Sequence, residues 1–140
     1  MKKIYIASDH AGFKLKSSIL LKFAKKKKII DLGPNSSISV DYPDYAKKLS
    51  KKIASDKGSL GILICGSGMG MAITANKIKN VRAALCYSNK NTKLSRLHNN
   101  ANIITLGSRL TKKNTAFKCI EVFINTKFGG GRHIKRVKKI

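Results

Sequence analysis

The stretch GILICGSGMGMA, residues 61–72, joins an apolar run to a glycine-rich loop and then to a second apolar segment. The first run has the length and composition of a buried strand, and the segment from Met69 has the spacing of a helix. A glycine-rich turn between a strand and a helix is typical of one unit of a parallel sheet. The thiol of Cys65 stands at the end of the predicted strand.

Strand-like and helix-like segments alternate outward from this unit in both directions. We predict strands at residues 3–8, 28–33, 61–65, 81–86 and 102–107. We predict helices at residues 13–26, 42–54, 69–78, 89–98 and 111–125, and a short basic helix within residues 129–140. The strands are apolar throughout, as expected when helices cover both faces of a sheet. The pattern predicts an α/β fold, a three-layer α/β/α sandwich with a Rossmann-like, five-stranded parallel sheet, in one domain over residues 1–140.

The 140 residues carry a formal net charge of +24, from 30 Lys and Arg against 6 Asp and Glu. This charge fits a nucleic-acid-binding protein, which gains affinity from phosphate contacts. It also fits the lysine-rich composition that AT-rich codons produce. We favour this second explanation because lysines are spread over nearly every segment. The aromatic residues, 5 Phe and 4 Tyr with no Trp, do not interleave with the basic runs as stacking platforms would. We therefore predict no specific nucleic-acid partner.

Three cysteines, Cys65, Cys86 and Cys119, are odd in number and too widely spaced for a disulfide framework or a zinc site. We expect reduced thiols and a cytoplasmic location. No apolar run reaches the length of a membrane span, and the N-terminal apolar stretch is too short for a signal peptide. We therefore expect no membrane partner.

Polar residues and glycines follow several predicted strands, and we expect them to meet at one edge of the sheet, where ligands bind in doubly wound folds. These residues are Ser8, Asp9 and His10 after the first strand, Cys65–Gly70 after the third, His98 and Asn99 after the helix that follows the fourth, and Ser108 and Arg109 after the fifth.

Each of these residues has a plainer explanation when it is taken alone. A loop histidine is more often a surface residue, and Cys65 could be a small buried hydrophobic residue. Glycines serve tight turns, Asp9 could cap the following helix, and Gly129–Gly131 could be a hinge. Their joint placement is what favours a shared ligand site.

The loop Cys65–Gly70 has a physical role in such a site. Positions without side chains let backbone N–H groups approach an anion, and the helix that begins near Gly70 adds a positive end. The loop lacks the Lys-Ser/Thr ending of a nucleotide P-loop, and it follows the third strand rather than the first, unlike a dinucleotide fingerprint. The same N–H groups could stabilise a developing oxyanion, and a thiolate at Cys65 suits a base or nucleophile.

Arg132 and Arg136 are four residues apart, so they share one face of the predicted C-terminal helix. Guanidinium groups suit a phosphate because they bind two oxygens at once. The alternative is a solvated basic tail, since Lys135, Lys138 and Lys139 lie beside them.

Several motifs, in order and over nearly the whole chain, resemble those of the type B ribose-5-phosphate isomerases. They are SDHAGF at residues 8–13, DYPDYA at 41–46, ICGSGMG at 64–70, ANK at 75–77, LSRLHNNANI at 94–103, LGSR at 106–109 and GGRH at 130–133. The wider family includes isomerases of galactose 6-phosphate and allose 6-phosphate. The resemblance implies a single sugar-phosphate isomerase domain that interconverts ribose 5-phosphate and ribulose 5-phosphate through an enediolate, without a metal or another cofactor.

The resemblance also implies a role for each matching residue. Cys65 would be the base, Ser67 and the backbone of its loop would hold the oxyanion, and His98 would assist ring opening. Asp9 and Asn99 would bind hydroxyls. The full set of substrate-binding residues would be Ser8, Asp9, His10, Tyr42, Gly66, Ser67, Gly68, Met69, Gly70, Asn99, Arg109, Arg132 and Arg136, with His10, Arg132 and Arg136 on the phosphate.

Similar enzymes are homodimers with active sites between the subunits, so the resemblance implies a homodimer or a tetramer. One branch of the family lacks the cysteine and has a Glu at the position of Met71. Met71 cannot accept a proton, so the base in this loop is either Cys65 or no residue of the loop. Two alternatives stay open. The chain could act on another sugar phosphate, such as allose 6-phosphate or galactose 6-phosphate, or it could be a basic nucleic-acid-binding protein on the same scaffold.

Overall fold

The structure, a computed structural model, describes residues 2–140, and each predicted strand and helix is present. The strands are β1 (Ile4–Ser8), β2 (Ile29–Asp31), β3 (Leu60–Cys65), β4 (Ala83–Leu85) and β5 (Ile103–Gly107). The helices are α1 (Phe13–Phe23), α2 (Tyr42–Ser55), α3 (Met69–Ala75), α4 (Asn89–Leu97), α5 (Lys113–Asn125) and α6 (Arg132–Val137). The predicted α/β fold class is confirmed.

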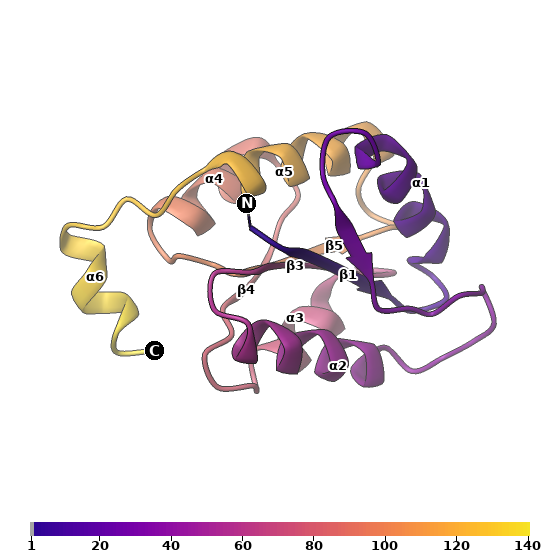
Figure 1. Ribbon diagram of the computed structural model, residues 1–140, viewed down its shortest axis with the longest axis horizontal. Coiled ribbons are helices and arrows are strands. Elements are labelled where there is room, and N and C mark those ends of the chain that lie inside the picture. Colours follow the sequence, from indigo (N-terminus) through magenta and orange to yellow (C-terminus); the bar gives the residue numbers. More distant parts are fainter. Residues whose placement is uncertain (1) are drawn as a thin grey trace.

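The five strands form one parallel sheet in the order β2-β1-β3-β5-β4 (Figure 1). The central strand β3 pairs with β1 on one side and with β5 on the other. Ile64 lies opposite Ser8, and Cys65 lies opposite Gly107. The chain moves outward from β1 to β2 and then returns to the other side of β1 to form β3. The switch point therefore lies between the carboxyl ends of β1 and β3, where a crevice is expected.

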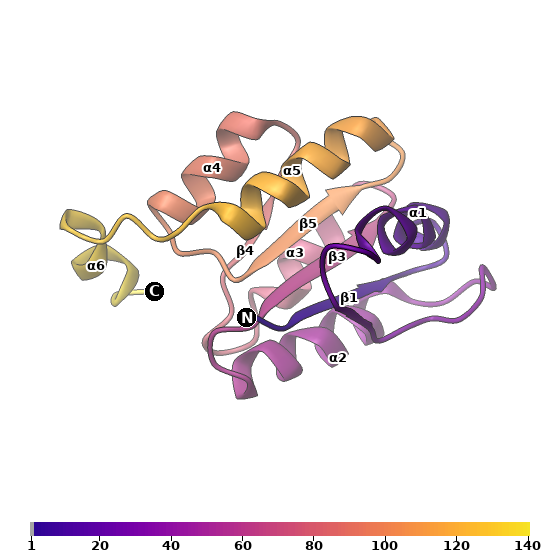
Figure 2. The same ribbon diagram turned by 45° about the horizontal axis from the view of Figure 1, so that its top comes forward.

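Helices cover both faces of the sheet (Figure 2). α1, α4 and α5 lie on one face, where Ile19 and Phe123 belong to the same buried cluster as Ile62. α2 and α3 lie on the other face, where Leu49 belongs to the same cluster as Leu63. Every residue of β1, β3 and β5 is buried because both sides of these strands are covered.

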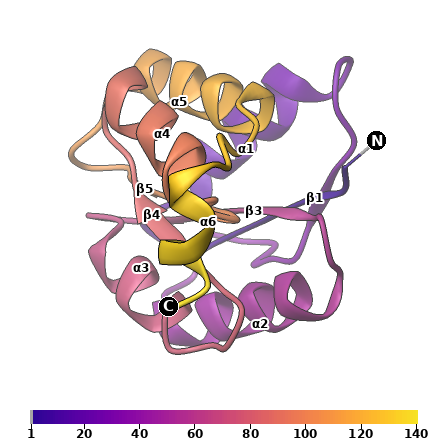
Figure 3. The ribbon, with the colours of Figure 1, turned by 90° about the vertical axis from the view of Figure 1, so that its left-hand side faces the viewer.

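Helix α6 lies apart from these layers, beyond the edge at which the strands begin (Figure 1), and lies in front of the sheet when the molecule is viewed from that end (Figure 3). None of its residues is buried. A hydrogen bond from the backbone N–H of Gly129 to the carbonyl of Leu97, at 3.0 Å, ties the segment before α6 to the end of α4. Over residues 2–140, no helix combines the length and the apolar composition needed to cross a membrane.

Candidate active site

A hollow of about 480 Å³ opens at the edge where the strands end, at the switch point. Its lining comes from the segments after β1, β3 and β5 and from the start of α2. The lining residues are Asp9, His10, Ala11, Tyr42, Cys65, Gly66, Ser67, Gly70, Arg109 and Leu110. All of them except Ala11 and Leu110 are residues that the sequence singles out.

Cys65 is the last residue of β3 and lines the hollow with a side chain that is 4% exposed. The backbone N–H of Gly68 donates a hydrogen bond to its Sγ at 3.1 Å. Gly68 has a φ of +78°, and a side chain there would come within 2.9 Å of the Leu106 carbonyl carbon. Glycine at this position therefore lets a backbone donor face the sulfur, where it stabilises negative charge.

The loop after Cys65 presents backbone donors that the fold does not use. The N–H of Met69 donates to Ser67 Oγ at 3.2 Å. The N–H groups of Gly66, Ser67 and Gly70 have no acceptor among residues 2–140. An anion bound at this loop would supply acceptors for these groups, as in an oxyanion hole.

Two glycines of the loop allow larger side chains to close around it. A Cβ at Gly70 would come within 2.5 Å of the Tyr42 ring, so the ring packs directly on the loop backbone. A Cβ at Gly66 would come within 3.0 Å of Arg109 Nη1. The hollow thus has an aromatic wall and a guanidinium group beside the thiol.

Asp9 and His10 enter the hollow from the turn after β1. One carboxylate oxygen of Asp9 accepts the N–H of Gly12 at 3.0 Å, while the other has no hydrogen-bond partner among residues 2–140. The N–H of Val40 donates to His10 Nδ1 at 3.2 Å, which fixes the imidazole against the loop before α2. Asp9 therefore closes the turn before α1 and still presents an acceptor to the hollow.

Four predicted loop residues, Ser8, Gly68, Met69 and Ser108, do not line the hollow. Ser8 is fully buried behind it, and its Oγ has no partner among residues 2–140. Ser108 donates from its Oγ to the Ala11 carbonyl at 2.8 Å and joins the β1 and β5 loops. Met69 is half exposed at the start of α3.

The expectation that His98 and Asn99 lie at this edge is wrong for a single chain. α4 runs back against the strand direction, so His98, at its C-terminal end, lies near the edge where β5 begins. β5 separates that edge from Gly107, the neighbour of Cys65, by about 13 Å. Residues that follow a helix and residues that follow a strand lie at opposite edges of a parallel sheet, because the helix carries the chain back to the edge where the strands begin.

At this opposite edge His98 stacks on His133, with ring centroids 4.3 Å apart and an interplanar angle of 17°. The pKa of His133 is lowered from its ordinary value, first because of desolvation and then because of repulsion by His98, Arg132 and Arg136. His133 was not among the predicted site residues. Its signal in the sequence was the GGRH motif, which also contains Arg132.

Arg132 and Arg136 are exposed on α6 and do not line the hollow at Cys65. One chain therefore brings together the predicted base, loop, Asp9, His10, Tyr42 and Arg109, and gathers a second set of predicted residues at the other edge. Among residues 2–140, no three His, Cys, Asp or Glu side chains form a group suited to a metal ion.

Residues 4–140 match the family described as Ribose/Galactose Isomerase. Among curated relatives, ribose-5-phosphate isomerase B of Escherichia coli is 38% identical over 141 residues, which cover 100% of this chain and 95% of the relative.

Solved structures give the same family resemblance. A ribose 5-phosphate isomerase from Thermotoga maritima superposes with a TM-score of 0.95 at 47% identity, covering 99% of this chain and 96% of that one. Ribose-5-phosphate isomerase B from Mycoplasma genitalium, solved with bound ribulose-5-phosphate, gives a TM-score of 0.93 at 42% identity. That match covers 98% of this chain and 92% of the other.

Proposed function

This chain belongs to the ribose/galactose isomerase family and is an isomerase, and we propose that it interconverts ribose 5-phosphate and ribulose 5-phosphate. The observation that carries the proposal is the Cys65 thiol beside unused backbone N–H groups in the hollow at the ends of β1 and β3. A base next to oxyanion donors suits proton abstraction beside a carbonyl group.

In the proposed reaction, Cys65 as thiolate removes the proton from the carbon next to the aldehyde. The N–H groups of the Gly66–Gly70 loop, with Ser67, stabilise the negative oxygen of the enediolate. The thiol then returns the proton to the former aldehyde carbon, and the hydroxyl proton moves to the former aldehyde oxygen. No atom or electron is gained or lost, so the step needs no co-reactant.

The remaining residues act on the rest of the sugar phosphate. The free carboxylate oxygen of Asp9 accepts a hydrogen bond from a substrate hydroxyl, and Tyr42 covers the sugar. His10 and Arg109 line the same hollow, and in this proposal they bind the phosphate group. A guanidinium group suits phosphate because it can donate to two oxygens at once.

We also propose that His98, Asn99, Arg132 and Arg136 come to this hollow from a second copy of the chain. One edge of the sheet, β4, is paired only with β5. Exposed apolar side chains flank that edge on both faces of the sheet, and such a patch is typical of an interface. They are Met69 and Ile73 on α3, Tyr87 after β4, and Leu94 on α4.

A two-fold axis beside β4 would set the two β4 strands antiparallel. The edge where one sheet ends would then lie next to the edge where the other sheet begins. His98 and α6 lie at the second of these edges, and α6 extends from its own chain without burying a residue. The pairing would complete two identical sites with His98 as the ring-opening residue.

The direct test is conversion of ribose 5-phosphate by the purified chain without added metal. We expect Cys65→Ala to lower kcat by about a hundredfold or more, because a positioned proton-transfer group is lost. Cys86→Ala is the matched control, since Cys86 is also buried but does not line the hollow. Retained turnover in Cys65→Ala, with an unchanged fold, would refute the assigned base.

Parallel assays with allose 6-phosphate and galactose 6-phosphate test which sugar is the substrate. A higher kcat/KM for either hexose phosphate than for ribose 5-phosphate would refute the pentose assignment.

A further inference from the structure

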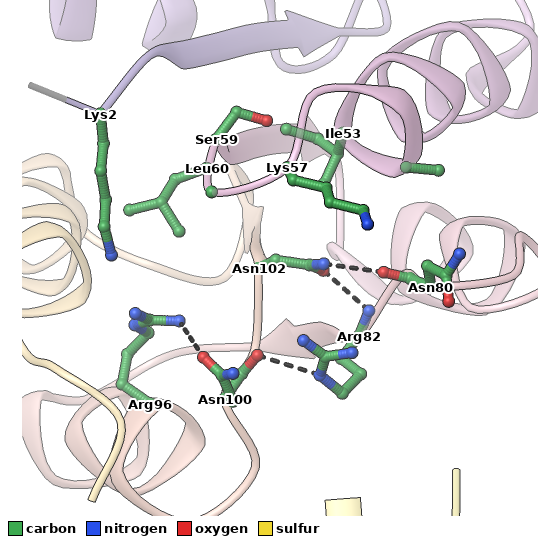
Figure 4. Close-up of a pocket in the computed structure, with 12 residues that line it drawn as sticks. Lys2, Ile53, Lys57, Ser59, Leu60, Asn80, Arg82, Arg96, Asn100 and Asn102 are labelled. Carbon is green, nitrogen blue, oxygen red and sulfur yellow. Dashed lines mark hydrogen bonds between the residues drawn. The ribbon is translucent and has the colours of Figure 1, made fainter. Parts of the chain in front are cut away.

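A second hollow, of about 380 Å³, lies at the opposite edge of the sheet, where the strands begin (Figure 4). Its walls come from the start of the chain, the turn between α2 and β3, the end of α4, and the segments before β4 and β5. The side chains that matter for its chemistry are Lys2, Lys57, Arg82, Arg96, Asn100 and Asn102.

Among residues 2–140, the lining contains four cations and no acidic residue. Figure 4 shows Lys2 and Lys57 on one side of the hollow, facing Arg96 and Arg82 on the other. Asp56, in the adjoining turn, does not line this hollow but lines a neighbouring one that also includes Lys2 and Lys57. Its carboxylate accepts a hydrogen bond from the Tyr5 hydroxyl at 2.7 Å and pairs with Lys3 at 3.5 Å. The positive charge of the hollow at Arg82 and Arg96 is thus not neutralised from within its own lining.

Arg96 is built into the wall. Its side chain is 3% exposed, and its Nε donates to the Thr126 carbonyl at 3.0 Å. Its Nη1 donates to Asn100 Oδ1 at 3.2 Å and to the Ala101 carbonyl. These bonds hold the guanidinium group in one orientation, and Nη2 has no acceptor among residues 2–140.

Arg82 is held by the same segment. Its Nε donates to the Asn100 carbonyl at 3.0 Å, and its backbone N–H donates to Asn102 Oδ1 at 2.8 Å. Both terminal nitrogens, Nη1 and Nη2, have no acceptor among residues 2–140. The two arginines are therefore fixed through Asn100 while several N–H donors are left for another molecule.

The positive charges of this hollow also repel one another, which disfavours the charged form of each group. The pKa of Arg96 is lowered from its ordinary value by burial first and then by repulsion from Arg82. The pKa of Lys2 is lowered by burial first, then by repulsion from Arg96 and Lys127. An anion in the hollow would offset this repulsion and accept the unused hydrogen bonds.

We propose that this hollow is a second anion site, separate from the site at Cys65, for a small molecule that carries two or more phosphoryl groups. Four cations match the charge of such a ligand, and two fixed guanidinium groups match its paired oxygens. No aromatic residue of the described part of the chain lines the hollow, so these residues offer no stacking surface for a nucleic-acid base. The volume and the lack of stacking favour a compact ligand over a polynucleotide.

The test is a titration of the full chain with sodium pyrophosphate, followed by the amide resonances in NMR spectra. The solution contains about 0.15 M salt, which screens diffuse surface charge. We expect the amides of Gly58, Asn100 and Asn102 to shift together and to saturate. Lys2→Gln with Lys57→Gln should weaken this binding about tenfold or more, because two of the four cations are lost. Both lysines are exposed, so the fold should be kept.

Lys47→Gln with Lys51→Gln is the matched control, because it removes the same charge from exposed lysines of α2 outside the hollow. It should change the affinity by less than about twofold. Equal weakening in both double variants would show charge attraction only and overturn the proposal. Shifts confined to the Gly66–Gly70 loop would also overturn it, since pyrophosphate would then bind only at the catalytic hollow. Ribose 5-phosphate turnover, measured alongside, tests the proposed function independently.

Discussion

Cys65 ends β3 at one edge of the sheet, and His98 follows α4 at the other edge of the same sheet. The predicted base and the predicted ring-opening residue therefore cannot meet on one substrate within one chain. In a dimer paired across β4, His98 of each subunit would lie beside Cys65 of the other subunit. This arrangement makes a clear prediction for mixed dimers.

We expect Cys65→Ala and His98→Ala each to be nearly inactive alone and to regain activity when they are mixed and allowed to exchange subunits. A mixed dimer has one site with both residues intact and one with neither. With random exchange, about a quarter of the wild-type activity should return. The measurement is ribose 5-phosphate turnover against mixing time. Activity that stays at the level of the separate variants would contradict a shared site.

Gly68→Ala should disturb the loop that faces the thiol. A side chain at φ +78° is strained, and here it would also meet the backbone of Leu106 and Gly107. We expect a loss of about 2 kcal/mol or more in the free energy of unfolding, together with reduced kcat. Urea denaturation and turnover assays check both effects.

Gly58→Ala is the control for this change, because Gly58 has a φ of +85° but nothing within 4 Å of the added Cβ. It should cost only the backbone strain, about 1 kcal/mol, and leave kcat unchanged. Equal losses in the two variants would mean that packing against β5 does not matter at Gly68.

Arg136→Gln should raise the pKa of His133, because one of the positive charges that lower it is removed. In the wild type, His133 has a lower pKa when it is stacked on His98 than when α6 is detached and His133 is exposed to solvent. Protonation of His133 therefore favours the detached state, so the stack should weaken as pH falls through the ordinary histidine range. Imidazole proton shifts in an NMR titration measure both effects. A His133 pKa at or above that of an unstructured histidine would disagree with the stacked arrangement.

The same variant tests the phosphate role of α6. Arg136→Gln should raise the KM for ribose 5-phosphate by about tenfold and change kcat little, because the phosphate does not react. Lys135→Gln is the control, since it removes a neighbouring charge that has no assigned role. A fall in kcat without a change in KM would place Arg136 at the reacting carbons.

Lys16→Met should destabilise the fold through Asp31. Lys16 is 1% exposed, and its Nζ donates to Asp31 Oδ1 at 2.8 Å and to the Pro34 carbonyl at 2.6 Å. Loss of the donor leaves a part-buried carboxylate and a carbonyl without their partner, at a cost of about 2 kcal/mol. Adding Asp31→Asn should restore part of the loss in thermal unfolding. A double variant less stable than Lys16→Met would show that the carboxylate contributes elsewhere.

The sequence was sufficient for the strands, the helices and the loop at Cys65. Apolar runs such as Leu60–Cys65 can be predicted as strands because burial on both faces excludes polar residues. The turn at Gly68 can be predicted because few residues other than glycine adopt its backbone conformation. Features of this kind depend on residues that are close in the sequence, so they were sufficient to predict the fold class correctly.

Only the tertiary structure decided which edge each residue occupies. A helix carries the chain back along the sheet, so His98 lies far from Cys65 although each stands at the end of a regular element. The cluster of Arg82, Arg96, Lys2 and Lys57 likewise depends on strand order, because four distant segments start or end at one edge. Residue spacing does not encode such proximity, since it arises from how the strands pair.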